Sequence, residues 1–182
     1  MGSLQEQIPF LKIGKKFIYV ETPMRIIGII SSLISVVLMV TYKQVSVFLG
    51  VEFVAKYSYS PAFKYFVVAN GVACFFSVVS LFLVKPCSKN PDRNKYFIIF
   101  MTDLVATVFC ATGCAAATSF GYTAFHGNEH TGWMKICDQF KKFCHRSIES
   151  IVLAYFASLL FLFLTIWSAW KSSKLHGVID CK

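Results

Sequence analysis

Four long apolar segments constrain the fold of this chain more than any other feature. They cover residues 26–42, 63–84, 97–122 and 151–170. A helix needs about 20 predominantly apolar residues to cross the hydrocarbon core of a bilayer. Hydrophobic residues make up 56% of the 182 residues, above the roughly 45–50% of an ordinary soluble domain. The sequence therefore predicts an all-α membrane protein, folded as a bundle of four transmembrane helices.

The remaining residues are too few for a separate soluble domain. We expect a cytoplasmic N-terminal segment at residues 1–23, one membrane domain at 24–173 and a cytoplasmic tail at 174–182. This orientation follows from the basic residues, because eleven of the 18 Lys and Arg lie on the side of the termini. The positive-inside rule places the more basic side in the cytoplasm.

The net charge of +9 fits this orientation. We attribute it to contact with anionic lipids of the inner leaflet rather than to nucleic-acid binding, because no basic stripe with stacking aromatic residues is present. Cys87 follows the second apolar segment on the basic side and is a candidate for palmitoylation.

The third segment carries a carboxylate, Asp103. A charge within hydrocarbon costs at least about 2.5–3.5 kcal/mol, so Asp103 is expected to face protein and to have a partner. Asp103 lies about seven residues into its segment, or about 10 Å deep at 1.5 Å per residue, and Arg25 stands at the same membrane edge. We predict that Arg25 and Asp103 form a salt bridge that sets the register of the first and third helices.

Two alternatives to this pair remain open. Arg25 could extend to a lipid phosphate while a hydroxyl of Thr22 or Thr102 bonds to the carboxylate. Asp103 could instead act without Arg25, in a proton relay or as an ion ligand.

Small and polar residues in the second and third segments predict close helix packing. Asn70 needs a hydrogen-bond partner inside the bundle, and the neighbouring Gly71 would permit close approach of another helix. Gly113 lies in a run of small residues in the third segment. We assign all three residues to helix packing.

The first noncytoplasmic loop reads QVSVFLGVEFVAKYSYSP. Its alternating pattern and its Val, Phe and Tyr residues favour extended structure, and the loop is compatible with a short β-hairpin.

The second noncytoplasmic loop contains Cys137 and Cys144, the only two of the seven cysteines expected on the oxidising side. A disulfide is the simplest state for such a pair. It requires Cα atoms about 4.4–6.8 Å apart, whereas seven residues of straight helix cover about 10.5 Å. The chain must therefore bend between the two cysteines.

Two histidines of the same loop, His126 and His130, flank Glu129 and raise the question of a metal site. Gly127 and Asn128 disfavour a helix there, and no third ligand stands at motif spacing. No nucleophile with a base, phosphate loop or dinucleotide motif is recognisable either. We therefore expect a protein that is not an enzyme and has no metal or cofactor.

The sequence resembles the plant CASP-like proteins, which belong to the family of Casparian strip membrane domain proteins and are related to the four-span MARVEL proteins. The resemblance covers residues 22–173. It is carried by TPMRIIG, YSPAFKYFVVANGVACFFS, MTDLVATVFCATGCAAA and HGNEHTGWMKICDQFKKFCHR. By position, Arg25 and Asp103 match the charged pair of the family, and Cys137 and Cys144 match its outer-loop cysteines.

The first loop lacks the Leu-Pro-Phe-Phe core that the founding Casparian strip proteins share. The resemblance is therefore to a CASP-like member of the first subgroup. It implies a non-enzymatic plasma-membrane scaffold that forms homo- and hetero-oligomers with CASP-like proteins. It also implies recruitment of secreted cell-wall enzymes, such as peroxidases, through the extracellular loops. The alternative is a small-solute channel or transporter subunit that uses Asp103 and Asn70.

Overall fold

The structure is a computed structural model. It describes the backbone of residues 3–48, 51–89, 93–128, 130 and 132–179, and the side chains of residues 20–47, 52–84, 94–128, 130 and 132–170. The side chain of Cys87, the candidate for palmitoylation, lies outside the described residues, as does Glu129 of the metal hypothesis.

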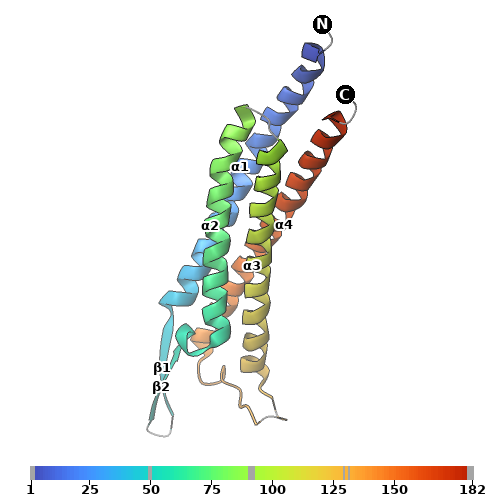
Figure 1. Cartoon of the computed structure of the whole chain (residues 1–182). Helices are drawn as coiled ribbons and strands as arrows, with labels where there is room; N and C mark the ends of the chain where they lie inside the picture. Colours follow the sequence, from blue (N-terminus) through green and yellow to red (C-terminus); the bar gives the residue numbers. More distant parts are fainter. Residues whose placement is uncertain (1–2, 49–50, 90–92, 129, 131, 180–182) are drawn as a thin grey trace.

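Four long helices form the bundle in Figure 1. They are α1 (Ser3–Thr41), α2 (Pro61–Lys89), α3 (Arg93–His126) and α4 (Lys141–Ile179). Each contains a segment long and apolar enough to cross a membrane. These segments are Val20–Thr41, Pro61–Val84, Asn94–His126 and Lys141–Trp170. The prediction of a four-helix membrane bundle is confirmed.

The helices form a ring in the order α1, α2, α3, α4. The main contacts run between α1 and α2, α2 and α3, α3 and α4, and α4 and α1, so α1 and α3 lie on a diagonal of the bundle. Figure 1 shows both termini at one end, which we call the termini end. The opposite end carries a β-hairpin and the α3–α4 loop, and we call it the hairpin end.

The predicted hairpin is present between α1 and α2. Its strands are β1 (Lys43–Phe48) and β2 (Val51–Lys56), which pair antiparallel with Lys43 opposite Lys56. A short 3₁₀ turn, η1 (Tyr57–Tyr59), leads from β2 towards α2. The hairpin is tied to the bundle, because Gln44 Oε1 accepts a hydrogen bond from the backbone N–H of Phe143 at 2.8 Å.

Helix α1 begins much earlier than the first apolar segment. The sequence led us to treat residues 1–23 as a segment separate from the first membrane helix, but the backbone is continuously helical from Ser3 to Thr41. At 1.5 Å per residue, these 39 residues extend about 58 Å, nearly twice the roughly 30 Å of a hydrocarbon core. The N-terminal segment is thus a continuation of the membrane helix.

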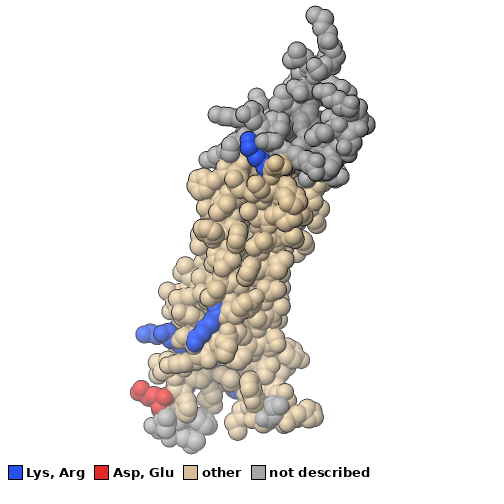
Figure 2. Space-filling view, in the orientation of Figure 1, with Lys and Arg blue, Asp and Glu red and all other residues tan. Residues whose placement is uncertain are grey.

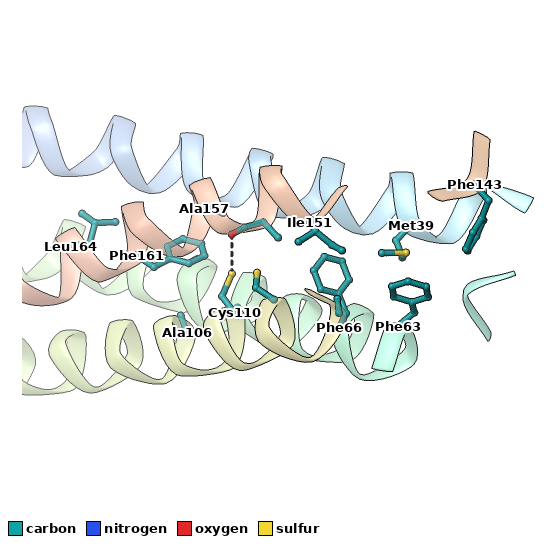
Figure 3. Packing of buried hydrophobic residues seen from close by; sticks show 14 residues of the cluster. Met39, Phe63, Phe66, Ala106, Cys110, Phe143, Ile151, Ala157, Phe161 and Leu164 are labelled. Atoms are coloured by element: carbon teal, nitrogen blue, oxygen red, sulfur yellow. Dashed lines mark hydrogen bonds between the residues drawn. The ribbon is translucent and has the colours of Figure 1, made fainter. Parts of the chain in front are cut away.

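The outer surface of the bundle is apolar, and its interior contains alanine and cysteine residues as well as bulky side chains. Figure 2 shows a wide band without Lys, Arg, Asp or Glu between the two ends. In Figure 3, the small residues Ala106, Cys110 and Ala157 lie along the core among bulky side chains such as Phe66, Ile151 and Phe161. Small residues let helix backbones approach closely in lipid, where burial of apolar side chains gives little driving force for helix association.

Candidate functional site

A group of four buried polar residues lies near the termini end of the bundle. We call it the polar cluster, and its members are Glu21, Arg25, Ser80 and Asp103. Helix α1 supplies the first two, α2 supplies Ser80 and α3 supplies Asp103. Arg25 is 1% exposed and Asp103 is 3% exposed, so both ionic groups are removed from the surroundings of the bundle.

The guanidinium of Arg25 binds the carboxylate of Asp103 through both Nη atoms. Nη1 donates to Oδ1 at 2.5 Å and Nη2 donates to Oδ2 at 2.7 Å. Two parallel charge-assisted bonds of this kind fix both the position and the orientation of the two planar groups. The pair connects α1 to α3 across the diagonal of the bundle.

Glu21 and Ser80 complete the polar cluster. Arg25 Nη2 also donates to Glu21 Oε1 at 2.8 Å, and Arg25 Nη1 donates to Ser80 Oγ at 2.6 Å. Ser80 Oγ in turn donates to Asp103 Oδ1 at 2.7 Å. A buried ion pair stabilises a fold only when its remaining hydrogen-bonding positions are largely satisfied, and Ser80 and Glu21 serve that purpose.

The structure thus brings the two predicted residues of the charged pair together. Thr102, one alternative partner for Asp103, instead donates its hydroxyl to the backbone carbonyl of Ile99 at 2.8 Å. Sequence reasoning missed Glu21 and Ser80. The signal for Glu21 was its position four residues before Arg25, a spacing that places two side chains on one helix face.

A second set of polar contacts surrounds Asn70 in the middle of the bundle. Its Nδ2 donates to the carbonyl of Phe66 at 2.9 Å. Its Oδ1 accepts from Ser32 Oγ at 3.4 Å and from Cys110 Sγ at 3.3 Å. Cys110 Sγ also contacts the carbonyl oxygen of Ala154 on α4, the dashed line in Figure 3. Asn70 therefore joins α2 to α1 and α3.

Hydroxyl pairs connect α4 to both of its neighbours. Ser35 of α1 and Ser150 of α4 each donate to the backbone carbonyl of the other at 2.8 Å. The hydroxyls of Thr107 on α3 and Thr165 on α4 lie 2.9 Å apart. Such contacts supply interhelical hydrogen bonds that contribute about 0.6 kcal/mol each on average within membranes.

The glycines differ in what they face. A Cβ added at Gly113 would lie 3.0 Å from Ala69 Cβ, so this glycine permits the close approach of α2 and α3. A Cβ added at Gly28, which sequence reasoning did not single out, would lie 2.7 Å from Phe161 Cε1 on α4. At Gly71 an added Cβ meets nothing within 4 Å. The assignment of Gly71 to packing within the bundle is wrong, because Asn70 points inward and the next residue is turned about 100° away.

Gly113 and Gly71 make a matched pair for a stability measurement. We expect Gly113→Leu to destabilise the bundle by about 1–3 kcal/mol, the usual cost of overpacking. Gly71→Leu should be neutral or stabilising, since leucine has the higher helix propensity and the position is open. Thermal unfolding in the same detergent would compare the two variants. Equal losses would contradict the packing role of Gly113.

The α3–α4 loop is closed by a disulfide between Cys137 and Cys144, whose Cα atoms are 5.7 Å apart. Cys137 precedes α4 and Cys144 lies in its first turn, so the chain bends between them as the spacing required. The backbone N–H groups of Ile136 and Cys137 both donate to the carbonyl of Ala124 at 3.0 and 3.2 Å. The loop is therefore fixed to α3 by hydrogen bonds and to α4 by the disulfide.

The two histidines of the metal hypothesis have separate surroundings. The His126 ring stacks on Tyr122 with centroids 4.2 Å apart, and the backbone N–H of His130 donates to Asn128 Oδ1 at 3.1 Å. Within the described part of the chain, no three His, Cys, Asp or Glu residues are grouped so that they could hold a metal ion.

Comparison with known proteins agrees with this picture. The family model described as "Casparian strip membrane protein domain" matches residues 14–160. The "CASP-like protein 1F1" of Populus trichocarpa is 45% identical over 92% of this chain and 93% of its own length. The protein of the same name from Ricinus communis is 43% identical over 91% and 93%. "CASP-like protein 1F2" of Populus trichocarpa is 44% identical over 91% and 92%.

No solved structure matches this chain. The family match and the curated relatives extend over most of the sequence, and the range that the family model matches contains both residues of the charged pair and both loop cysteines. The chain therefore belongs to the Casparian strip membrane protein domain family.

Proposed function

We propose that this multi-pass membrane protein is a non-enzymatic scaffold of the plasma membrane. It associates with copies of itself and with other CASP-like proteins through its membrane helices. Both termini face the cytoplasm, in line with the excess of Lys and Arg on their side. The hairpin end faces outward and contacts secreted proteins that modify the cell wall.

One observation carries this proposal: among the described residues of the membrane helices, every fully buried polar side-chain atom except Arg25 Nε has a hydrogen-bond partner within the protein. Asp103 has both oxygens on Arg25, and the Asn70 amide bonds within the bundle. A transport pathway needs polar groups that face a water-filled cavity or bind the solute. The polar groups here instead hold the helices in place, which is what a rigid scaffold requires.

The hairpin end supplies a surface suited to partner contact. It presents the hairpin beside a loop that the disulfide restrains. The loop exposes Trp133 and Met134, and Met134 is 87% exposed. Aromatic residues and methionine are enriched in protein interfaces.

Single-molecule photobleaching in plant plasma membrane at native abundance tests the scaffold. We expect several bleaching steps per spot and fluorescence recovery that is slow compared with a monomeric four-span control. A double variant, Trp133→Ser with Met134→Ser, should keep the step number and lose capture of secreted wall proteins. Single-step spots that diffuse freely would refute the scaffold.

The second candidate remains the small-solute channel or transporter subunit that uses Asp103 and Asn70. Both residues lie in the described interior, which is the observation in its favour. Vesicle flux assays on wild type and Asn70→Ala distinguish it. Solute flux that the substitution abolishes, with assembly unchanged, would favour this candidate over the scaffold.

A further inference from the structure

An open groove of about 560 Å³ lies at the hairpin end, between the residue that follows α1 and the first turns of α4. Every side chain that lines it carries a polar or charged group. We call it the basic groove, and its lining residues are Tyr42, Lys141, Lys142, His145, Arg146 and Glu149. Three of them are Lys or Arg and one is an acid, so the groove has an excess of positive charge.

Glu149, the acid of the basic groove, already has two basic neighbours. Its Oε2 accepts a hydrogen bond from Arg146 Nη1 at 2.8 Å, and its Oε1 lies 3.5 Å from His145 Nε2. The Arg146 guanidinium also lies over the ring of Tyr42, 6.0 Å from the ring centroid. These contacts fix the position of the guanidinium, but they leave the rest of the positive charge without compensation.

The uncompensated charge belongs to Lys141 and Lys142. Neither ammonium group forms an ion pair with any residue that the structure describes. Both lysines lie in the first turn of α4, which contains no acidic residue. The N-terminus of a helix carries partial positive charge and favours anions, so two cations there are electrostatically unfavourable. A negatively charged ligand in the basic groove removes this repulsion.

The basic groove lies where the membrane segments end. The apolar segment of α1 stops directly before Tyr42, and that of α4 begins at Lys141. This is the level of the polar headgroups, where tyrosine is enriched. Deeper in the membrane, Val152 and Phe156 continue the same face of α4 by helical spacing and are 61% and 49% exposed. An exposed apolar surface therefore leads from the basic groove towards the middle of the membrane.

We propose that the basic groove binds the phosphate of an anionic membrane lipid, whose acyl chains lie on the apolar face of α4. Lys141 and Lys142 donate to the phosphate oxygens, and the fixed guanidinium of Arg146 adds a third positive charge. A soluble anion meets the same charges but gains nothing from the apolar surface beyond them. Membrane orientation alone does not explain these cations, because the positive-inside rule favours basic residues at the termini end.

Native mass spectrometry of the full chain in detergent, with lipid added, tests the site. The probes are phosphatidic acid and phosphatidylcholine with identical acyl chains. We expect phosphatidic acid to bind about tenfold more tightly, because no choline neutralises its phosphate. A Lys141→Gln, Lys142→Gln double variant should lose about ten- to thirtyfold in affinity for phosphatidic acid. Equal affinities of the wild type for the two lipids would overturn the proposal.

The matched control is a Lys64→Gln, Lys135→Gln double variant. It removes the same charge from two exposed positions of the hairpin end that do not line the basic groove. This variant should bind phosphatidic acid like the wild type. Both double variants should fold, since all four lysines are exposed and the loss of cations from the first turn of α4 favours that helix. Equal losses of affinity in the two double variants would show that the groove is not a distinct site.

Two further measurements identify the source of the phosphate and its place. Glycerol 3-phosphate and a uronic-acid oligomer carry negative charge without acyl chains, and neither should displace phosphatidic acid at the concentration at which its short-chain form does. Displacement by either would assign the groove to a soluble anion instead. A phosphatidic acid with a diazirine near the start of its acyl chain should crosslink to α4 close to Val152 and Phe156. Crosslinks confined to other helices would contradict the proposal.

Discussion

Asp103→Ala should lower the stability of the bundle by about 3 kcal/mol or more. The substitution leaves the Arg25 guanidinium buried with only Glu21 and Ser80 as partners, and breaking a buried ion pair from one side costs about 3–5 kcal/mol. At about 2–4 °C per kcal/mol for a chain of this length, Tm should fall by about 6–12 °C. Thermal unfolding in detergent, followed by intrinsic fluorescence, measures the shift.

The control for this prediction is a double-mutant cycle. Arg25→Met with Asp103→Leu removes both charges of the pair, so the double variant should lose less stability than the two single losses combined. Ser80→Ala removes a neutral hydroxyl from the same cluster and should cost only about 1 kcal/mol. Additive losses across the cycle would show that Arg25 and Asp103 do not stabilise the fold as a pair.

Removal of the disulfide should have the second-largest effect, confined to the hairpin end. A closed loop of this length contributes about 2–3 kcal/mol by the chain-entropy relation. In a Cys137→Ser, Cys144→Ser double variant, the loop should open more often. The backbone amides of residues 136 and 137 should therefore lose protection against hydrogen exchange. We expect hydrogen exchange there to rise about 30- to 150-fold, at 1.4 kcal/mol per factor of ten.

Amides in the middle of α2 and α3 serve as the internal control and should exchange at the wild-type rate. Wild type treated with a reducing agent should reproduce the exchange pattern of the double variant. Unchanged exchange at the loop amides after reduction would show that the bonds to Ala124 alone hold the loop.

The sequence predicted the helices because each apolar segment is long enough to cross a bilayer, and it predicted the hairpin because the loop alternates. It did not predict where α1 begins, since the polar residues before Val20 look the same in a tail and in a solvated helix. An isolated carboxylate in lipid is costly, so Asp103 needs a partner, and the sequence offers few candidates for that partner. The charged pair was therefore predictable. Ser80 was not, because many serines lie in the helices and only packing decides which one faces Asp103.

The glycines show the same limit. A single sequence gives no direct sign of which side of a helix meets a neighbour when apolar residues face both lipid and protein. Gly71 was assigned to packing because it follows Asn70, although neighbouring residues in a helix point in different directions. Gly28 was overlooked and yet has the nearest neighbour of the three, Phe161.

The diagonal placement of the Arg25 and Asp103 bond has a mechanical consequence. Four parallel helices that contact only their neighbours in the ring can slide sideways past one another, so that a square cross-section becomes a rhombus. A bond between diagonally opposite helices prevents this movement, and the Arg25–Asp103 pair joins two such helices, α1 and α3. The bundle should therefore keep one cross-section, so that neighbouring copies in a membrane would meet surfaces of constant shape.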